Sequence, residues 1–358
     1  MLRAGAVHGS TEERPRGARL MMLEWHITRR CNLSCHHCYI DYLTPIQELS
    51  DDECTSLLDT LVAMGVPGII FSGGEPLLRA ELLLRLIAEC SRCGVRSVLA
   101  TNGVLLDQRM LGRLKDAGLY MVGISIDSAE AARHDRFRGV EGSFEASARA
   151  IAVCAENGMP VQVQTVASKQ NKDEVAAVTE LCRRWGVTKH LVLDFVPCGR
   201  AASEAALVLD RSEREALLDL IYEESRSDNG LTVEYIEPYW QRKICQMEPE
   251  RGAELRRRFF QGGTCMGGNA FAAIMPGGDV LPCPRLQVVA GNVREQDFAD
   301  IWRDAPVFGA MRDPQSLGGK CPTCTQRDLC DGCRARALLH SGDLLGPDPC
   351  CIGYEEKD

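Results

Sequence analysis

Three cysteines near the amino end of the chain have the spacing of ligands for an iron–sulfur cluster. Cys31, Cys35 and Cys38 are separated by three and then by two residues. Thiolates at this spacing can hold three corners of a four-iron cube and leave the fourth iron without a protein ligand. A metal centre that performs chemistry keeps such a position open, whereas a closed structural centre uses four protein ligands. The loop therefore predicts a reactive cluster, and the alternative is a zinc site completed by His36 or His37.

A second group of cysteines lies near the carboxyl end. The chain contains 18 cysteines, and in a reducing compartment so many thiols indicate metal binding rather than disulfides. Those with ligand-like spacing are Cys265, Cys283, Cys321, Cys324, Cys330, Cys333 and Cys350, with Cys351 next to the last. Cys54, Cys154 and Cys182 stand singly in helical patterns, where we expect small buried residues. Spacing alone does not distinguish iron from zinc in the carboxyl-terminal group.

The composition is that of an ordinary globular protein. The 358 residues are 45% hydrophobic and 25% charged, and no apolar run approaches the roughly 18 residues that span a bilayer. The formal charge of -9 disfavours a large nucleic-acid surface. Residues 1–20 are polar and lack the apolar core of a secretory signal. We therefore expect a cytoplasmic protein that binds neither membranes nor nucleic acid.

Short strands rich in valine and isoleucine alternate with helical patterns along most of the chain. The expected strands cover residues 23–28, 68–72, 97–101, 121–126, 161–166 and 190–196. Strict alternation with right-handed crossovers predicts a parallel sheet covered by helices. Six units predict an α/β fold with a partial (β/α)6 TIM barrel, whose functional residues lie at the carboxyl ends of the strands.

The strand–helix periodicity fails after the sixth unit and the helix that follows it. Beyond that point the sequence is first irregular and aromatic-rich, and then dominated by glycine, proline and cysteine. We therefore expect two domains joined by a bridging region. The expected parts are a flexible tail (1–20), the barrel (21–228), a linker (229–264) and a small cysteine-rich domain (265–358).

The segment Gly73-Gly74-Glu75-Pro76 follows the second expected strand. Together with the cysteine loop, it resembles the radical S-adenosylmethionine (SAM) superfamily, in which both motifs occur in this order. The resemblance implies that the open iron binds the amino and carboxylate groups of SAM. One electron from the cluster would then cleave SAM to methionine and a 5′-deoxyadenosyl radical. The protein's part is to position and insulate these cofactors.

The same resemblance implies roles for residues at the strand ends. Residues 73–76 would bind the SAM amino group, because glycines let the backbone approach a ligand and Glu75 offers an acceptor to an ammonium. Tyr39 would lie beside the adenine, and Arg138 would pair with the SAM carboxylate. The residues with implied contacts to the methionyl and ribose groups are Asn102, Ser125, Asp127 and Gln164.

The carboxyl-terminal cysteines resemble the SPASM extension of radical SAM enzymes, which normally carries two auxiliary 4Fe-4S clusters. The resemblance implies a crossed pattern of ligands. One cube would be held by Cys321, Cys324, Cys330 and Cys350, with Cys351 as an alternative to Cys350. The other would be held by Cys265, Cys283 and Cys333, with Cys245 as a candidate fourth ligand. Only Asp331 and Gly332 separate Cys330 from Cys333, whereas the family usually has three residues there.

Further segments resemble the heme-biosynthetic branch of SPASM enzymes. These segments are residues 134–139, 196–200, 291–295 and 333–337. The branch includes the alternative heme b synthase, which oxidatively decarboxylates porphyrin propionates, and relatives on the way to heme d1. The implied function is hydrogen abstraction from a tetrapyrrole side chain, with electrons from an external one-electron reductant of the ferredoxin or flavodoxin type. The alternatives are a peptide maturase and, in another class, a non-catalytic iron–sulfur electron carrier.

Several other residues are candidates for the substrate pocket. Cys198 follows the end of the sixth expected strand, while Tyr235, Tyr239 and Trp240 lie in the aromatic-rich stretch. Core packing, and an ordinary loop position for the cysteine, is the simpler explanation of these residues and the one that we favour. Arg200 could pair with a substrate carboxylate, but an arginine does not distinguish a porphyrin propionate from the carboxyl end of a peptide.

Overall fold

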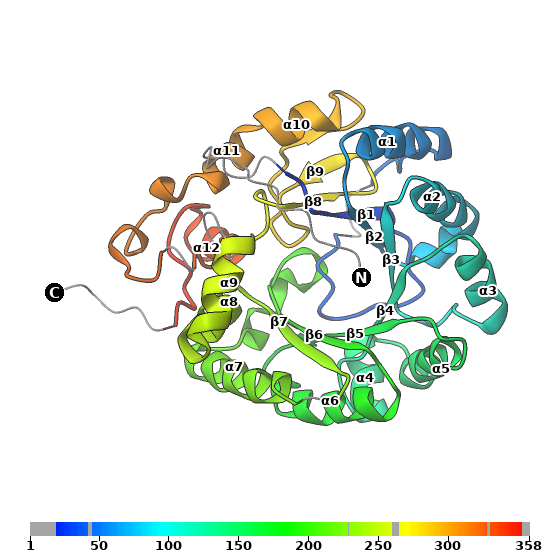
Figure 1. Cartoon of the computed structure of the whole chain (residues 1–358), viewed down its shortest axis with the longest axis horizontal. Coiled ribbons are helices and arrows are strands. Elements are labelled where there is room, and N and C mark those ends of the chain that lie inside the picture. Colours follow the sequence, from blue (N-terminus) through cyan, green and yellow to red (C-terminus); the bar gives the residue numbers. More distant parts are fainter. Residues whose placement is uncertain (1–18, 42–44, 228, 260–264, 328–329, 353–358) are drawn as a thin grey trace, which may run out of the picture.

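The computed structural model describes residues 19–41, 45–227, 229–259, 265–327 and 330–352. One ten-stranded sheet runs through the molecule in the order β10-β9-β8-β1-β2-β3-β4-β5-β6-β7. Figure 1 shows its strands around the centre, with the helices outside them. The strands are β1 (Met22–Thr28), β2 (Gly68–Gly73), β3 (Arg96–Thr101), β4 (Met121–Ser125), β5 (Val161–Ala167), β6 (Lys189–Asp194), β7 (Thr232–Ile236), β8 (Phe271–Ile274), β9 (Asp279–Leu281) and β10 (Gly291–Asn292).

Helices follow most strands and cover the outside of the sheet. They are α1 (Asp51–Ala63), α2 (Ala80–Arg92), α3 (Gln108–Asp116), α4 (Ala131–Arg138), α5 (Ser143–Glu156), α6 (Val175–Arg184), α7 (Arg211–Ser225), α8 (Pro238–Met247), α9 (Pro249–Phe259), α10 (Phe298–Asp304), α11 (Pro306–Arg312) and α12 (Arg334–Ser341). The first helix begins at a capping box, as its sequence predicts: Ser50 accepts from the Glu53 amide and Glu53 accepts from the Ser50 amide. None of the helices in the described ranges is long and apolar enough to cross a membrane.

Alternation along β1 divides its side chains between two environments. Leu23, Trp25 and Ile27 are at most 1% exposed and belong to the core between the sheet and the helices. Successive side chains of a strand point to opposite faces. Glu24 and His26 therefore point to the inner face of the curved sheet, which we call the lumen. The strand thus anchors itself in the core and presents polar groups to the interior of the barrel.

The sheet confirms the α/β fold and partial barrel expected from the sequence, and it extends further than expected. Strands β1 to β7 pair in sequence order and in parallel. The last of them, β7, lies in the stretch where the periodicity fails, and its Val233 and Tyr235 are buried. At the other edge β8 pairs in parallel with β1, and β9 and β10 continue the sheet antiparallel. The carboxyl-terminal region is thus joined to the barrel by a shared sheet.

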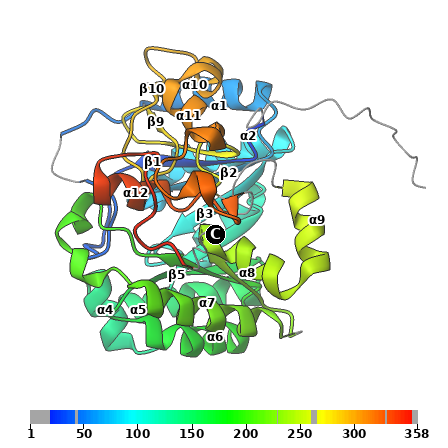
Figure 2. The same cartoon turned by 90° about the vertical axis from the view of Figure 1, so that its left-hand side faces the viewer.

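Helix α10 in the carboxyl-terminal region lies against the first helix of the barrel. Figures 1 and 2 both show α10, in orange, close to α1. Helix α10 contacts α1 directly. Arg294 strengthens this connection, since its guanidinium lies 2.6 Å from Glu53 Oε1 and 3.0 Å from the Glu48 carbonyl oxygen. The carboxyl-terminal region therefore contacts the segment that leads from the cysteine loop into α1.

His190 is buried between β6 and α6 with two neutral partners. Its Nε2 lies 2.8 Å from Thr165 Oγ1 and its Nδ1 lies 3.0 Å from Thr179 Oγ1. Burial lowers the pKa of His190 to about 4, and the positive charge of Arg183 acts in the same direction. The imidazole is therefore neutral in the folded protein at every pH above that value.

We expect this histidine to make the fold less stable in mild acid. The unfolded chain binds the proton near pH 6.5 and the folded chain only near pH 4, so stability is lost as the pH falls between these values. The loss from His190 amounts to roughly 2 kcal/mol between pH 7 and pH 5. Urea unfolding at both pH values measures it, and His190→Gln should remove that part of the slope. An unchanged slope in the variant would contradict the prediction.

Candidate active site

The cysteine loop begins at the carboxyl end of β1, and the carboxylate of Glu48 holds the residues that lead into it. Glu48 accepts hydrogen bonds from Thr28 Oγ1 at 2.9 Å and from the Arg29 amide at 2.7 Å. On its other side the loop donates to the end of α4: the Ser34 and His36 amides bond to the carbonyls of the last residues of that helix. Because the last carbonyls of a helix have no partner within it, α4 serves as a fixed anchor for the loop.

The structure brings the three thiols of the loop together. Burial raises the pKa of Cys35 to about 11; Arg138 opposes this shift, while Cys38 and Cys31 add to it. The pKa of Cys31 is also raised, by burial first and by Cys38 among its neighbours. Thiols that oppose one another's ionisation lose their protons when a metal binds them, so the donor set fits the cationic irons of a cluster.

The two histidines of the loop do not complete a compact metal site. The His37 ring stacks on Phe137 with centroids 4.1 Å apart, and its Nε2 faces Asp127 at 3.7 Å. Within the described part of the chain, no group of three His, Cys, Asp or Glu side chains converges closely enough to hold a single metal ion. A four-iron cube spaces its ligands more widely than a single ion does.

Gly73 and Gly74 allow the end of β2 to press against the cysteine loop. The Gly74 amide bonds to the Thr28 carbonyl, and the Glu75 amide bonds to the Arg30 carbonyl, both at 2.8 Å. A Cβ on Gly73, whose φ is +129°, would lie 2.2 Å from the Thr28 carbonyl oxygen, and one on Gly74 would lie 2.2 Å from that of Arg30. The glycines therefore have a packing role in addition to the SAM contact predicted for them.

Glu75 is fully buried and bonds within the protein. Its carboxylate accepts from Thr101 Oγ1 at 2.8 Å, from the Asn102 amide at 2.9 Å and from the Leu77 amide at 3.0 Å. Burial raises its pKa, and the backbone bonds from Asn102 and Leu77 oppose that shift. Pro76 follows at the start of a short 3-10 turn, Pro76–Arg79. Glu75 thus fixes the ends of β2 and β3 relative to each other, and its predicted bond to the SAM ammonium stays a prediction.

Two residues predicted to bind SAM, Asp127 and Arg138, form a buried ion pair with each other. Arg138 Nε and Nη2 lie 2.7 and 2.6 Å from Asp127 Oδ2. Burial alone would raise the pKa of Asp127, but Arg138 and His37 hold it below its usual range. Arg138 Nη1 also lies 3.9 Å from Cys35 Sγ. The pair therefore places a positive charge beside the cysteine loop, where it favours the thiolate.

The remaining predicted SAM contacts lie around the same opening. Asn102 donates to Asn32 Oδ1 at 2.8 Å, next to the cysteine loop. Ser125 and Gln164 are paired neighbours on β4 and β5. The Gln164 amide occupies the space over Gly123, where a Cβ would lie only 3.2 Å from it. These side chains thus lie on the lumen side of the sheet, as a ligand-binding role requires.

A polar cluster on the lumen side was not found from the sequence. It consists of Glu24, His26, Tyr39 and Ser72. Glu24 Oε1 lies 2.9 Å from His26 Nε2 and accepts from Tyr39 Oη at 3.1 Å. Burial alone would raise the pKa of Glu24, but its bonds with His26, Tyr39 and Ser72 outweigh that effect and lower it. The cluster connects Tyr39, which follows the third cysteine, to the interior of the barrel.

One group of carboxyl-terminal cysteines lies next to the cysteine loop. Cys265, Cys283 and Cys333 pack in one apolar cluster with Cys198, which is 3% exposed. Burial raises the pKa of Cys198 to about 12; Arg285 opposes the shift, and Cys283, Cys333 and Cys38 add to it. Cys198 therefore lies close to both the loop and this group. Its place just after the sixth expected strand is the only sequence signal for it.

Cys245, the fourth ligand suggested by the sequence, lies on α8 against α9. A Cβ on Gly252 would lie 2.9 Å from the sulfur of Cys245.

The second group of carboxyl-terminal cysteines lines one small cavity. That group consists of Cys321, Cys324, Cys330 and Cys351.

Backbone hydrogen bonds fasten the end of the cysteine loop to distant parts of the chain. The Ala201 amide bonds to the Cys38 carbonyl at 3.1 Å, and the Arg200 amide to the Ile40 carbonyl at 3.2 Å. Gly199 permits this approach, because a Cβ there would lie 2.0 Å from the Tyr39 carbonyl oxygen. From the carboxyl-terminal region, Gln287 Nε2 donates to that same carbonyl at 3.0 Å. The 3-10 turn Gly199–Ser203, which follows β6, and the cysteine-rich region thus jointly position the loop.

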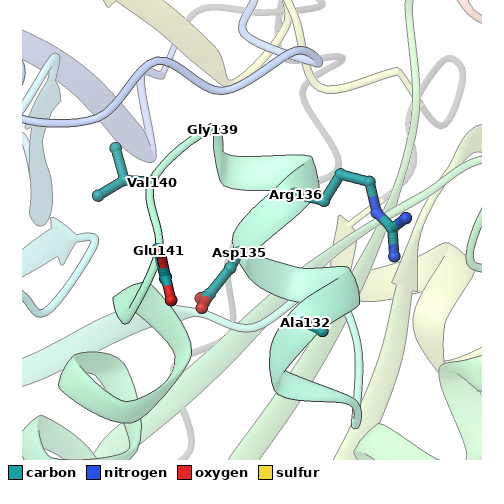
Figure 3. Close-up of a pocket in the computed structure, with 6 residues that line it drawn as sticks. All are labelled: Ala132, Asp135, Arg136, Gly139, Val140 and Glu141. Carbon is teal, nitrogen blue, oxygen red and sulfur yellow. The ribbon is translucent and has the colours of Figure 1, made fainter.

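A surface hollow of about 490 Å³ lies outside this site, at the corner between α4 and α5. Figure 3 shows its lining: Ala132, Asp135, Arg136, Gly139, Val140 and Glu141. Asp135 is engaged by the start of α5, since it accepts from the Gly142 amide at 2.7 Å and the Phe144 amide at 2.8 Å. The hollow is therefore a structural corner and contains none of the residues expected to bind cofactors.

Comparisons with protein families agree with this geometry. Residues 25–182 match the radical SAM superfamily, and residues 265–334 match the SPASM iron–sulfur cluster-binding domain. Among solved structures, Streptococcus suis SuiB bound to S-adenosylmethionine aligns over 94% of this chain and 78% of its own, with a TM-score of 0.75 and 18% identity. The structure of anSMEcpe with bound AdoMet aligns over 93% and 94%, with a TM-score of 0.71 and 18% identity. These two likenesses show the fold.

Curated relatives are more similar in sequence. The AdoMet-dependent heme synthase of Methanosarcina barkeri is 36% identical over 337 residues, which are 92% of this chain and 96% of that protein. The pre-heme d1 synthase of Dinoroseobacter shibae is 30% identical and covers 94% and 87%. The PqqA peptide cyclase of Xanthomonas euvesicatoria is 32% identical and covers 91% and 86%. The chain belongs to the radical SAM superfamily and carries a carboxyl-terminal SPASM domain, and its relatives include heme synthases.

Proposed function

We propose that this chain oxidatively decarboxylates propionate side chains of an iron tetrapyrrole. The observation that carries the proposal is the 36% identity to the Methanosarcina barkeri heme synthase, because it extends over 92% of this chain and 96% of that relative. An identity confined to cofactor motifs would indicate only the superfamily. Two further heme synthases, at 35% and 34% identity over similar lengths, support the same assignment.

When bound, the cluster and SAM would supply a 5′-deoxyadenosyl radical that removes a hydrogen atom from the substrate. The loss of carbon dioxide from the substrate radical releases one further electron, which an auxiliary cluster held by the carboxyl-terminal cysteines would accept. The chain's own residues bind the substrate and orient it. The Glu24–His26 pair forms part of the lumen wall, and His26 Nδ1 has no hydrogen-bond partner among the described residues. At the carboxyl ends of the strands, Arg285 donates to the Asp194 carbonyl at 2.9 Å and lies near Cys283. We assign Arg285 and Arg200 to the substrate carboxylates, because a guanidinium pairs with them in two hydrogen bonds.

Incubation of the reconstituted protein with iron-coproporphyrin III, SAM and reductant under anaerobic conditions tests the proposal. We expect mass spectrometry to show the loss of carbon dioxide and two hydrogens from a propionate, together with 5′-deoxyadenosine. The same mixture without SAM is the control. Formation of 5′-deoxyadenosine with an unchanged porphyrin would contradict the substrate assignment and leave the superfamily chemistry intact.

Peptide modification is the second candidate, and PqqA peptide cyclases at 32% and 31% identity favour it. If the porphyrin stays unchanged in that experiment, peptide modification becomes the preferred assignment. A non-catalytic electron carrier is separated from both by equilibrium dialysis with SAM, since a carrier has no use for a SAM site. Absence of SAM binding by the reconstituted protein would favour the carrier.

A further inference from the structure

Two adjacent cysteines near the carboxyl end occupy different environments. Cys351 lines the cavity that is also lined by Cys321, Cys324 and Cys330. Cys350, the residue expected from the sequence, is not among the residues that line it. Its sulfur lies 4.0 Å from the carbonyl oxygen of Leu209, a buried residue of the main hydrophobic core.

Asp348 explains why the thiols of the adjacent residues Cys350 and Cys351 lie in different environments. Its Oδ1 accepts from the Cys350 amide at 2.9 Å, and its main-chain carbonyl accepts from the Cys351 amide at 3.1 Å. These bonds form a tight turn that holds both cysteine amides on one aspartate. Tyr239 Oη donates to Asp348 Oδ2 at 2.8 Å, and Arg336 Nη2 donates to the same oxygen at 2.8 Å. The turn therefore has a fixed orientation, since its aspartate is 3% exposed and fully bonded.

The same aspartate reaches the other cysteine group. Asp348 Oδ2 accepts from the Cys333 amide at 2.8 Å. Cys333 packs with Cys265 and Cys283, so Asp348 positions residues of both groups. A shift of this turn that exchanged Cys350 for Cys351 would have to break these bonds. The observed orientation is thus imposed by the buried network around the turn.

We propose that Cys351, and not Cys350, is the fourth ligand of a four-iron cluster held by Cys321, Cys324 and Cys330. Four thiolates form a donor set suited to an iron–sulfur cube. Four protein ligands leave no open iron, which assigns this cluster to electron transfer. Lys320 and Arg242 line the same cavity, and their positive charges offset part of the charge of the thiolates. The proposal rests on the SPASM part of the assignment and not on the choice of substrate.

Alanine variants of the two neighbours form a matched test in the full chain. After anaerobic reconstitution, Cys351→Ala should bind about four fewer iron atoms than the parent, whereas Cys350→Ala should keep the full amount. The reverse pattern, equal losses or no loss in either variant would overturn the proposal. Because the measurement is bound iron, an enzyme that leaves iron-coproporphyrin III unchanged still gives a valid result.

A second measurement avoids variants that fail to fold. The parent protein is alkylated with iodoacetamide with its clusters in place and again after chelation, and the labelled peptides are quantified by mass spectrometry. Cluster loading should protect Cys351 strongly and leave the labelling of Cys350 unchanged. Protection of Cys350 alone, or the same change at both residues, would contradict the assignment.

Discussion

Replacing Cys35 by alanine is expected to abolish the formation of 5′-deoxyadenosine. The loop offers three thiols that the structure brings together, with Arg138 Nη1 3.9 Å from Cys35 Sγ. A cube that loses one of three protein ligands is no longer held at the site where SAM binds, so no electron reaches the sulfonium. Chromatography of the reaction with SAM and dithionite measures the product.

Cys154→Ala is the matched control, because Cys154 is a fully buried cysteine on α5. This variant should retain 5′-deoxyadenosine formation, although it loses some stability to the small cavity it creates. Product formation at the parental rate by the Cys35 variant would show that the loop does not hold the reactive cluster. Loss of product in both variants would point to a folding defect.

Arg336→Met is expected to destabilise the fold by about 3–5 kcal/mol, because it leaves the buried carboxylates of Glu237 and Asp348 without the guanidinium that they pair with. Arg336 is 4% exposed and sits at the centre of three ion pairs. Its guanidinium lies 2.8 Å from Asp194, 2.6 Å from Glu237 and 2.8 Å from Asp348. These partners come from β6, from the start of α8 and from the turn before Cys350. Urea unfolding measures the change.

The control for this variant is Arg303→Met. Arg303 pairs with Asp300 and Asp304 on α10, but its side chain is 63% exposed. Exposed pairs contribute at most about 1 kcal/mol, so this variant should unfold near the parental urea concentration. Similar losses in both variants would show that the buried network is no more important than a surface pair.

The features that the sequence predicts best are those set by local spacing. The cysteine loop and the Gly73–Pro76 segment each lie within a few residues of chain, and strand ends of a parallel sheet meet at one edge. Once the alternation of strands and helices is recognised, it therefore predicts that these two segments lie close together in the fold. The capping box at Ser50 and Glu53 is local in the same sense.

Features that depend on tertiary pairing could not be predicted in this way. Strand β7 is five residues long, and it becomes a strand by pairing with β6. The ion pair between Asp127 and Arg138 joins residues that the sequence treats as separate SAM contacts. The choice between Cys350 and Cys351 depends on a turn around Asp348, because spacing counts residues and does not orient side chains.

The pairing of β1 with β8 has a consequence for how the chain is made. Met22–Trp25 of β1 pair with Phe271–Ile274, so one edge of the strand that carries the cysteine loop stays open until synthesis has passed residue 274. Open strand edges are sites of aggregation in partly folded chains. Nascent chains that end before β8 therefore carry an open strand edge that favours aggregation. A gene fragment encoding only residues 21–228 would yield an aggregation-prone product rather than an independent enzyme.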